Sequence, residues 1–103
     1  MNKYHARRAY RNGYVFASLA EAERYSELQL MEKAEAIHHL TVHPVYMLTV
    51  NGVHIGNYIG DFEYWESGKQ IVEDVKGFST PVYKLKKKLM AAIHGIEITE
   101  VPA

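Results

Sequence analysis

Residues 58–77 of the chain, YIGDFEYWESGKQIVEDVKG, predict two neighbouring strands joined by a tight turn. The turn is expected at residues 66–69, where Ser and Gly separate two runs of β-prone residues. Side chains alternate between the two faces of a strand, so Asp74 and Lys76 share one face and Glu73 lies on the other. The second strand therefore presents an acid and a lysine side by side on one face of a sheet.

The acidic residues of these two strands predict a metal site. If the strands pair through the turn, Asp61 on the first strand approaches Asp74 on the second. Two adjacent carboxylates repel each other unless a cation lies between them, and oxygen ligands favour Mg²⁺ or Mn²⁺. Lys76 would then position the attacking water or neutralise charge on a phosphate.

An upstream helix supplies a further carboxylate. Ser18 and Glu21 have the spacing of a capping box, and helix-forming residues continue to about Ala36. Glu21 lies on the same stripe as Tyr25 and Leu28, which should face the sheet, and a carboxylate there needs a partner. Glu21 is therefore either a member of the site or only a capping residue that reaches back to the Ser18 amide. The two roles are compatible.

The remaining elements are predicted from turn and capping residues. Asn12-Gly13 and Asn51-Gly52 favour hairpin turns, while Thr80 and Pro81 begin a second helix that Gly95 ends. We expect a hairpin over residues 10–16, a strand from 38 to 50, a return strand from 53 to 64 bent at Gly56 or Gly60, a strand over 70–76 ended by Gly77, and a last strand over 96–101. The order helix, three antiparallel strands, helix, strand predicts an α/β fold in which one mixed sheet has a helix against each face.

The composition is that of a folded protein. The 103 residues suffice for one domain, and 48% of them are hydrophobic and 23% charged. The absence of cysteine excludes disulfides and cysteine-based zinc sites and fits a reducing cytoplasm. No apolar run approaches the roughly 20 residues that cross a bilayer, and the basic N-terminal stretch lacks the apolar part of a secretory signal. We expect a single domain over residues 1–103, in the cytoplasm and away from membranes.

The charges are segregated along the chain. Twelve basic and twelve acidic residues sum to zero, which at face value argues against a polyanion as partner. However, residues 1–20 carry four bases and no acid, residues 21–74 carry ten acids and three bases, and residues 75–103 carry five lysines and two acids. The folded chain can therefore still present a basic face, especially if a cation occupies the acidic middle.

Together these motifs resemble the PD-(D/E)xK nuclease superfamily, and in particular a group of small phage proteins related to Holliday-junction resolvases. The resemblance implies the restriction-endonuclease-like αβββαβ core of that superfamily. One departure is Gly60, which stands where the superfamily often has a proline before its first acid. The similar stretches cover nearly the whole chain and are Ser18-x-x-Glu21, Tyr58-Ile-x-Asp61-Phe62, Glu73-Asp74-Val-Lys76-Gly77 and the helix at Tyr83–Lys88.

The resemblance also implies roles for individual residues. Asp61 and Asp74 would be the two metal-binding acids, and Lys76 would be the catalytic lysine. Glu21 would be the helix-borne acid near the metal, and the backbone carbonyl of Val75 a further ligand. The expected metal is Mg²⁺ or Mn²⁺.

Two basic segments are candidates for DNA binding. The second helix follows the lysine-bearing strand, and its polar face could hold phosphates, although a run of lysines is by default a solvated helix face. The N-terminal arm, residues 1–17, mixes basic and aromatic side chains such as Tyr4, His5 and Tyr10. The DNA-binding candidates are Arg7, Arg8, Arg11, Thr80, Tyr83, Lys84 and Lys87.

The function expected from these features is metal-dependent endonuclease activity on DNA. The resemblance favours branched DNA such as a Holliday junction, a role in phage DNA recombination in the cytoplasm of a bacterial host, and a homodimer. The alternative is a non-catalytic DNA-binding accessory protein that retains the nuclease fold. The chain has the complete set of carboxylates, which repel one another. A non-catalytic protein would have no physical need to keep them, and this argues against the alternative.

Other titratable residues are assigned no chemistry. His39 and His43 have a spacing that binds zinc on a helix, but Pro44 favours an extended conformation for His43, so a metal role is disfavoured. Glu63 and Glu73 are expected to point outward and pair with lysines.

Overall fold

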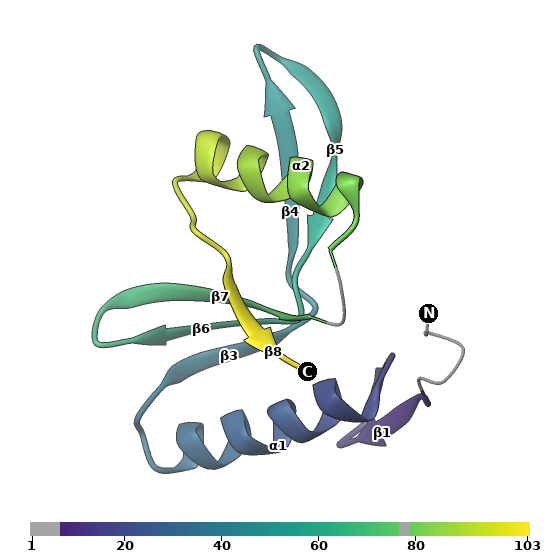
Figure 1. Ribbon diagram of the computed structural model, residues 1–103. Helices are drawn as coiled ribbons and strands as arrows, with labels where there is room; N and C mark the ends of the chain where they lie inside the picture. The colour runs from purple at the N-terminus through teal and green to yellow at the C-terminus, as the bar shows by residue number, and fades with distance from the viewer. Residues whose placement is uncertain (1–6, 77–78) are drawn as a thin grey trace.

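The computed structural model describes residues 7–76 and 79–103, and Figure 1 shows their arrangement. The expectations for Tyr4 and His5 of the arm, and for Gly77 as the end of a strand, lie outside the described residues. In chain order the elements are β1 (Ala9–Arg11), β2 (Tyr14–Phe16), α1 (Leu19–Lys33), β3 (His38–Val42), β4 (Val45–Val50), β5 (Val53–Ile59), β6 (Phe62–Glu66), β7 (Lys69–Lys76), α2 (Pro81–Leu89), the π-helical turn η2 (Met90–His94) and β8 (Thr99–Pro102).

The central sheet is mixed and has the order β3-β6-β7-β8. β3, β6 and β7 pair antiparallel, whereas β8 pairs parallel to β7. The tight turn between β6 and β7 is confirmed, since Ser67 and Gly68 both have positive φ, at 52° and 76°. This turn sets the register in which Phe62 lies opposite Glu73.

The two helices cover opposite faces of this sheet, as predicted, with α1 below it and α2 above it in Figure 1. Tyr25 and Leu28 of α1 pack with Phe62 of β6 in one buried cluster. On the other face, Val72 of β7 packs with Met90 of η2 in a second cluster. The alternation along β7 therefore directs neighbouring residues into two separate cores.

The start of α1 follows the predicted capping pattern. The Ser18 side chain accepts a hydrogen bond from the Glu21 N–H, at 3.2 Å. The helix ends at Lys33 rather than at about Ala36, because Glu35 has a positive φ of 61° that turns the chain out of the helix.

The predicted long hairpin over residues 38–64 is wrong in one respect: both of its strands are interrupted. His43 has a positive φ of 54°, which ends β3, and Gly60 with Asp61 separates β5 from β6. β4 and β5 therefore form a two-stranded sheet of their own, with the predicted Asn51-Gly52 turn at its tip. Figure 1 shows this hairpin rising from the central sheet on the side of α2.

The hairpin at residues 9–16 is confirmed and is packed against the rest of the chain. Asn12 and Gly13 form its turn with φ values of 52° and 85°. Phe16 is fully buried, and Asn12 donates a 3.1 Å hydrogen bond to the Tyr25 hydroxyl of α1. The part of the expected arm that the structure describes is thus anchored to the first helix.

The second helix begins as predicted, because Thr80 accepts a hydrogen bond from the Tyr83 N–H and Pro81 takes the first helical position. Gly95, with φ of 68°, ends the helical stretch after η2. β8 begins at Thr99 rather than at Ile96, because residues 96–98 connect η2 to the sheet and bury Ile98.

Candidate functional site

Asp61 is held in place by its backbone and by its side chain. At the bend between β5 and β6, its N–H donates to the carbonyl of Glu73 and its carbonyl accepts from the N–H of His43, both at 3.0 Å. Its carboxylate oxygen Oδ2 accepts a 2.6 Å hydrogen bond from the Val75 N–H. The bend thus fixes Asp61 between the end of β3 and the middle of β7.

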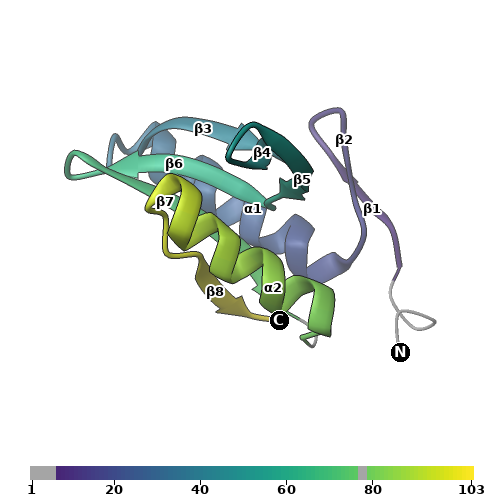
Figure 2. The same ribbon diagram turned by 90° about the horizontal axis from the view of Figure 1, so that it is seen from above.

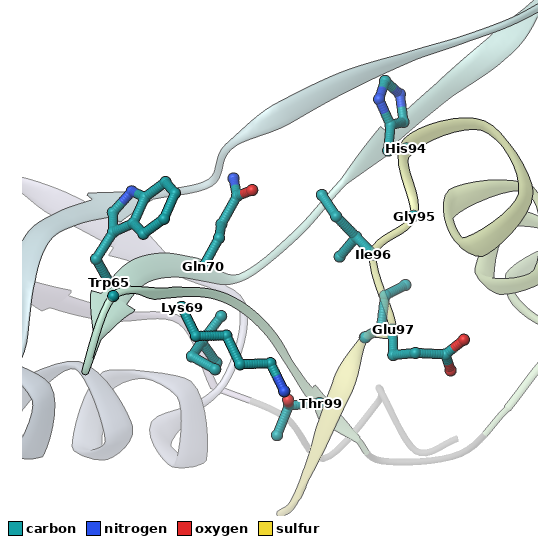
Figure 3. A pocket seen from close by; sticks show the side chains of 11 residues that line it. Trp65, Lys69, Gln70, His94, Gly95, Ile96, Glu97 and Thr99 are labelled. Atoms are coloured by element: carbon teal, nitrogen blue, oxygen red, sulfur yellow. The ribbon is translucent and has the colours of Figure 1, made fainter.

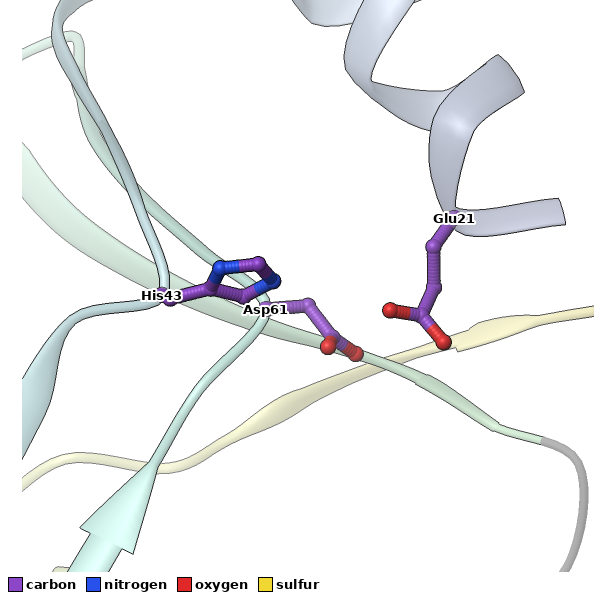
Figure 4. Close-up of side chains that lie close together, drawn as sticks. All are labelled: Glu21, His43 and Asp61. Carbon is purple, nitrogen blue, oxygen red and sulfur yellow. The ribbon is translucent and has the colours of Figure 1, made fainter. Parts of the chain in front are cut away.

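Glu21, His43 and Asp61 converge from three separate segments (Figure 4). One potential ligand atom from each lies within 4.8 Å of the other two. Glu21 comes from the first turn of α1, where its carboxylate also accepts a 3.1 Å hydrogen bond from the Ser18 hydroxyl. Glu21 therefore takes part in the helix cap through the Ser18 hydroxyl, and its carboxylate also faces His43 and Asp61.

The neighbouring carboxylates and burial affect the pKa of Asp61. Burial and the negative charges of Glu21 and Asp74 together raise the pKa of Asp61 to about 7, against the opposing effect of the Val75 hydrogen bond. A buried carboxylate next to two others is the environment in which a bound cation or a proton is favoured.

Asp74 lies on the α2 face of β7 and is bound by a tyrosine. The Tyr58 hydroxyl donates a 2.8 Å hydrogen bond to Asp74 Oδ2. Burial raises the pKa of Asp74, although the Tyr58 hydrogen bond and the positive charge of Lys76 act in the opposite direction. Burial also raises the pKa of Tyr58, which stays a hydrogen-bond donor. Tyr58 is a contact residue to which sequence analysis gave no role.

Lys76 lies over an aromatic ring. Its Nζ is 3.5 Å from the ring centroid of Tyr83, a cation–π contact between β7 and α2. The Tyr83 hydroxyl donates a 2.7 Å hydrogen bond to Glu100 of β8, and Lys87 forms a 3.2 Å ion pair with the same carboxylate. The hydrogen bond from Tyr83 and that from Lys87 lower the pKa of Glu100. Lys76 is thus oriented by Tyr83, and two of the expected DNA-binding side chains contact Glu100.

Glu73 corrects an expectation, because it does not point outward to a lysine. Its side chain is 1% exposed and receives both Arg24 Nε, at 2.9 Å, and Arg24 Nη2, at 2.6 Å. The Tyr64 hydroxyl donates to the same carboxylate. The hydrogen bond to Glu73 raises the pKa of Arg24. This bidentate pair joins α1 to β7 one helical turn after Glu21.

Glu63 also differs from expectation, since its carboxylate accepts a hydrogen bond from the Tyr46 hydroxyl of β4 rather than pairing with a lysine. The bend at residues 43 and 60–61 brings the hairpin β4–β5 close enough for this contact.

The other expected DNA-binding residues lie at two surfaces. Arg7 and Arg8 are exposed just before β1, whereas Arg11 is half-buried and donates to the Tyr10 carbonyl at 3.0 Å. Thr80 caps α2, and Lys84 is exposed on it. In Figures 1 and 2 the N-terminal hairpin and the start of α2 lie toward the same end of the molecule.

A hollow of about 600 Å³ lies at the opposite end of β7. It is bordered by the starts of β7 and β8 and the end of η2, with Trp65 at one side and Glu97 at the other (Figure 3). Asp74 follows Lys69 by five residues along the strand, roughly 17 Å, so the hollow is separate from the acidic cluster.

The described residues thus form a mixed α+β protein in which Glu21, His43 and Asp61 lie together just before the start of β6. None of the helices among them combines the length and the apolar composition needed to cross a membrane. The sequence model of the family described as "Protein of unknown function (DUF1064)" matches residues 1–99, and the chain belongs to this family. No curated protein and no solved structure matches the chain.

Proposed function

We propose that this chain is a divalent-metal-dependent endodeoxyribonuclease of the PD-(D/E)xK type. With the hairpins β1–β2 and β4–β5 set aside, the elements follow the order α1, β3, β6, β7, α2, β8. This is the αβββαβ order that the sequence resemblance implies. The parallel pairing of β8 with β7 beside an antiparallel β3-β6-β7 set gives further support.

The observation that carries the proposal is the meeting of acids from distant segments beside a lysine. Glu21 of α1 and Asp61 of the bend approach each other within 4.8 Å, and Asp74 is close enough to raise the pKa of Asp61. Lys76 lies two residues beyond Asp74 on the same strand. Carboxylates that lie close together repel each other, and a bound cation between them offsets that repulsion.

The donor set fits a hard or borderline divalent cation. Glu21 and Asp61 offer carboxylate oxygens and His43 offers a nitrogen within one group, and Asp74 and the Val75 carbonyl are the further ligands that the resemblance implies. Oxygen ligands suit Mg²⁺ and Mn²⁺, and an imidazole nitrogen favours Mn²⁺ over Mg²⁺. When bound, such a cation would lower the pKa of a water and polarise the phosphate.

The residues of the chain supply the remaining requirements of hydrolysis. Lys76 places a positive charge beside the acidic cluster, where it would offset the charge that develops on the phosphate. Tyr83 keeps the Lys76 ammonium at 3.5 Å from its ring, and so limits the positions the lysine can take. Tyr58 holds one oxygen of Asp74, which orients the other.

The proposed substrate is DNA, which the chain would contact at the phosphates of the backbone. Arg7, Arg8 and Lys84 are exposed, so they can contact the phosphates of a DNA backbone. Branched DNA, such as the four-way junction of phage recombination, is the proposed form. Since one small catalytic unit cuts one strand, cleavage of two strands would use a homodimer.

A cleavage assay on four substrates tests this proposal. The purified chain is incubated with Mg²⁺ or Mn²⁺ and matched linear duplex, single-stranded, flap and four-way-junction DNA. We expect metal-dependent cleavage that is fastest on the four-way junction. Tight DNA binding with no cleavage of any substrate would contradict the proposal and favour the DNA-binding accessory protein.

A further inference from the structure

The hairpin β4–β5 has an apolar face that no other described element covers. Val45, Met47, Ile55 and Ile59 lie on this outer face, and each is between 54% and 62% exposed. Four apolar side chains of this size on one face of a hairpin normally indicate a face packed against another surface.

The opposite face of the same hairpin is buried, which shows that the hairpin has an inner and an outer side. Tyr46, Leu48 and Tyr58 point inward and pack near Met90 of η2. Val45 pairs directly with Ile59, so these two outer side chains lie next to each other. Figures 1 and 2 show α2 crossing one side of the hairpin only.

The exposed area is large for a hairpin of this size. At about 100 Å² for each side chain, the outer face presents on the order of 400 Å² of apolar surface, the size of the largest functional patches on monomers. Val50 and Val53 at the tip are also exposed, but Val50 follows the inward-facing Leu48 by two residues, so this pair lies outside the patch. With its polar rim, such a face approaches the lower end of what one partner buries in a specific dimer, about 600 Å².

The β4–β5 hairpin has no charged side chains, and this indicates which kind of partner can bind its outer face. Residues 36–60 contain no Lys, Arg, Asp or Glu, although 23% of the chain is charged. A DNA backbone or a strongly charged protein would find no complementary charge on this hairpin. In a two-fold dimer the same side chains meet their own copies, and an uncharged apolar face is compatible with itself.

We propose that a second copy of this chain covers the outer face of the β4–β5 hairpin in a two-fold symmetric dimer. This interface is independent of the nuclease proposal. If the nuclease proposal also holds, the interface affects where cleavage occurs, because His43 and Asp61 of the candidate site lie at the base of the hairpin. The dimer would then hold two sites at fixed positions on either side of the two-fold axis.

The mass of the chain in solution tests the dimer. At about 100 µM, a concentration suited to an interface of this size, light scattering after size exclusion should give twice the monomer mass of 11.8 kDa. Met47→Lys and Ile59→Lys each place a charge on the outer face and should give the monomer mass. Leu30→Lys changes an equally exposed leucine of α1, 67% exposed, and should stay a dimer. Circular dichroism establishes that each variant is folded.

Single cysteines locate the interface without destabilising it. Because the chain has no cysteine, Val45→Cys, Met47→Cys, Ile55→Cys and Ile59→Cys each introduce one unique thiol. Under mild oxidation at least one of these variants should form a covalent dimer, and Leu30→Cys should not. A monomeric wild-type chain at about 100 µM, a dimer that persists in folded Met47→Lys and Ile59→Lys, or equal cross-linking at Leu30→Cys would overturn the proposal.

Discussion

Gly60, immediately before Asp61, is a position where a side chain has no room. A Cβ added there would lie 3.2 Å from Val72 Cγ1 and 3.4 Å from Pro44 Cγ. The Gly60 N–H also donates a 2.9 Å hydrogen bond to the Pro44 carbonyl, which proline could not do. The departure from the superfamily pattern at Gly60 therefore has a local physical reason, the closure of the hairpin base.

Gly60→Ala should lower the free energy of unfolding by about 1–3 kcal/mol, because the added methyl group overpacks the contact with Val72 and Pro44. Urea unfolding followed by circular dichroism measures this change. Gly56→Ala is the matched control, since nothing lies within 4 Å of the Cβ added there, and its effect should stay within about 0.5 kcal/mol. Equal effects of the two substitutions would contradict the described packing.

Asp61 should give the metal-free protein a characteristic dependence on pH. Its pKa is about 7 in the folded chain and near 4 when unfolded, so the folded state binds the proton more tightly. The stability that this proton contributes is present below about pH 4 and is lost as the pH rises to about 7.

Asp61→Asn removes that titration and keeps an oxygen for the Val75 N–H. In a chelator, its free energy of unfolding relative to the wild type should therefore rise between pH 4 and pH 8, by on the order of 3 kcal/mol. Denaturant titrations at a series of pH values measure the difference. A difference that does not change with pH would mean that Asp61 is not buried beside other carboxylates.

The part of the candidate site that depends on the spacing of residues along one strand or one helix was predictable from the sequence. Asp74 and Lys76 share a strand face because strands alternate, and Glu21 faces inward because of its helical stripe. His43 and Tyr58 were not identifiable in this way. Their places depend on a positive φ at His43, which local patterns do not predict, and on the bend at Gly60, which was one of the two predicted bend positions.

At the scale of the elements, the position of α1 on the sheet depends on a buried ion pair. Arg24 binds Glu73 with two hydrogen bonds, and Glu21 lies one turn earlier on the same helix. The prediction that Glu73 and Asp74 lie on opposite faces of β7 is confirmed, since Glu73 contacts Arg24 of α1 and Asp74 contacts Tyr58. It gave Glu73 the wrong partner, because the distance between α1 and β7 in space is not encoded in local patterns.

Arg24→Ala should lower the free energy of unfolding by about 3 kcal/mol, because it leaves the Glu73 carboxylate buried without its cation. Glu27→Ala is the control, since Glu27 is an exposed partner of the same arginine, and its effect should be below about 0.5 kcal/mol. Chemical denaturation measures both. Equal losses in the two variants would show that the Arg24–Glu73 pair does not hold α1 on the sheet.

For the whole molecule, the order of elements was predictable because each has local start and stop signals, such as Ser18 and Thr80 for the two helices. The division of the predicted long hairpin into two sheets was not, since residues 38–50 and 53–64 keep β-type patterns throughout. That division matters for function. It forms the bend that carries Asp61 and raises a hairpin with an apolar outer face.

The positions of the charges in the whole molecule also explain the zero net charge. Eight of the twelve bases lie at residues 1–20 or in the lysine run 84–88, and the described part of the first segment and the start of α2 lie toward one end of the molecule. Among the ten acids of the middle segment, Glu21 and Asp61 lie together and Glu73 is in the buried pair with Arg24. A neutral sum therefore does not oppose a DNA partner.

The central claim is that the acids and the lysine beside β7 form a catalytic centre, and one comparison tests it directly. The rate of four-way-junction cleavage with Mn²⁺ or Mg²⁺ is measured for the wild type, Asp74→Asn and Lys76→Ala, with circular dichroism to establish that the variants are folded. The proposed mechanism predicts a loss of at least about 100-fold in both variants, because each removes a group that stabilises the transition state. Folded variants that cleave at the wild-type rate would contradict it.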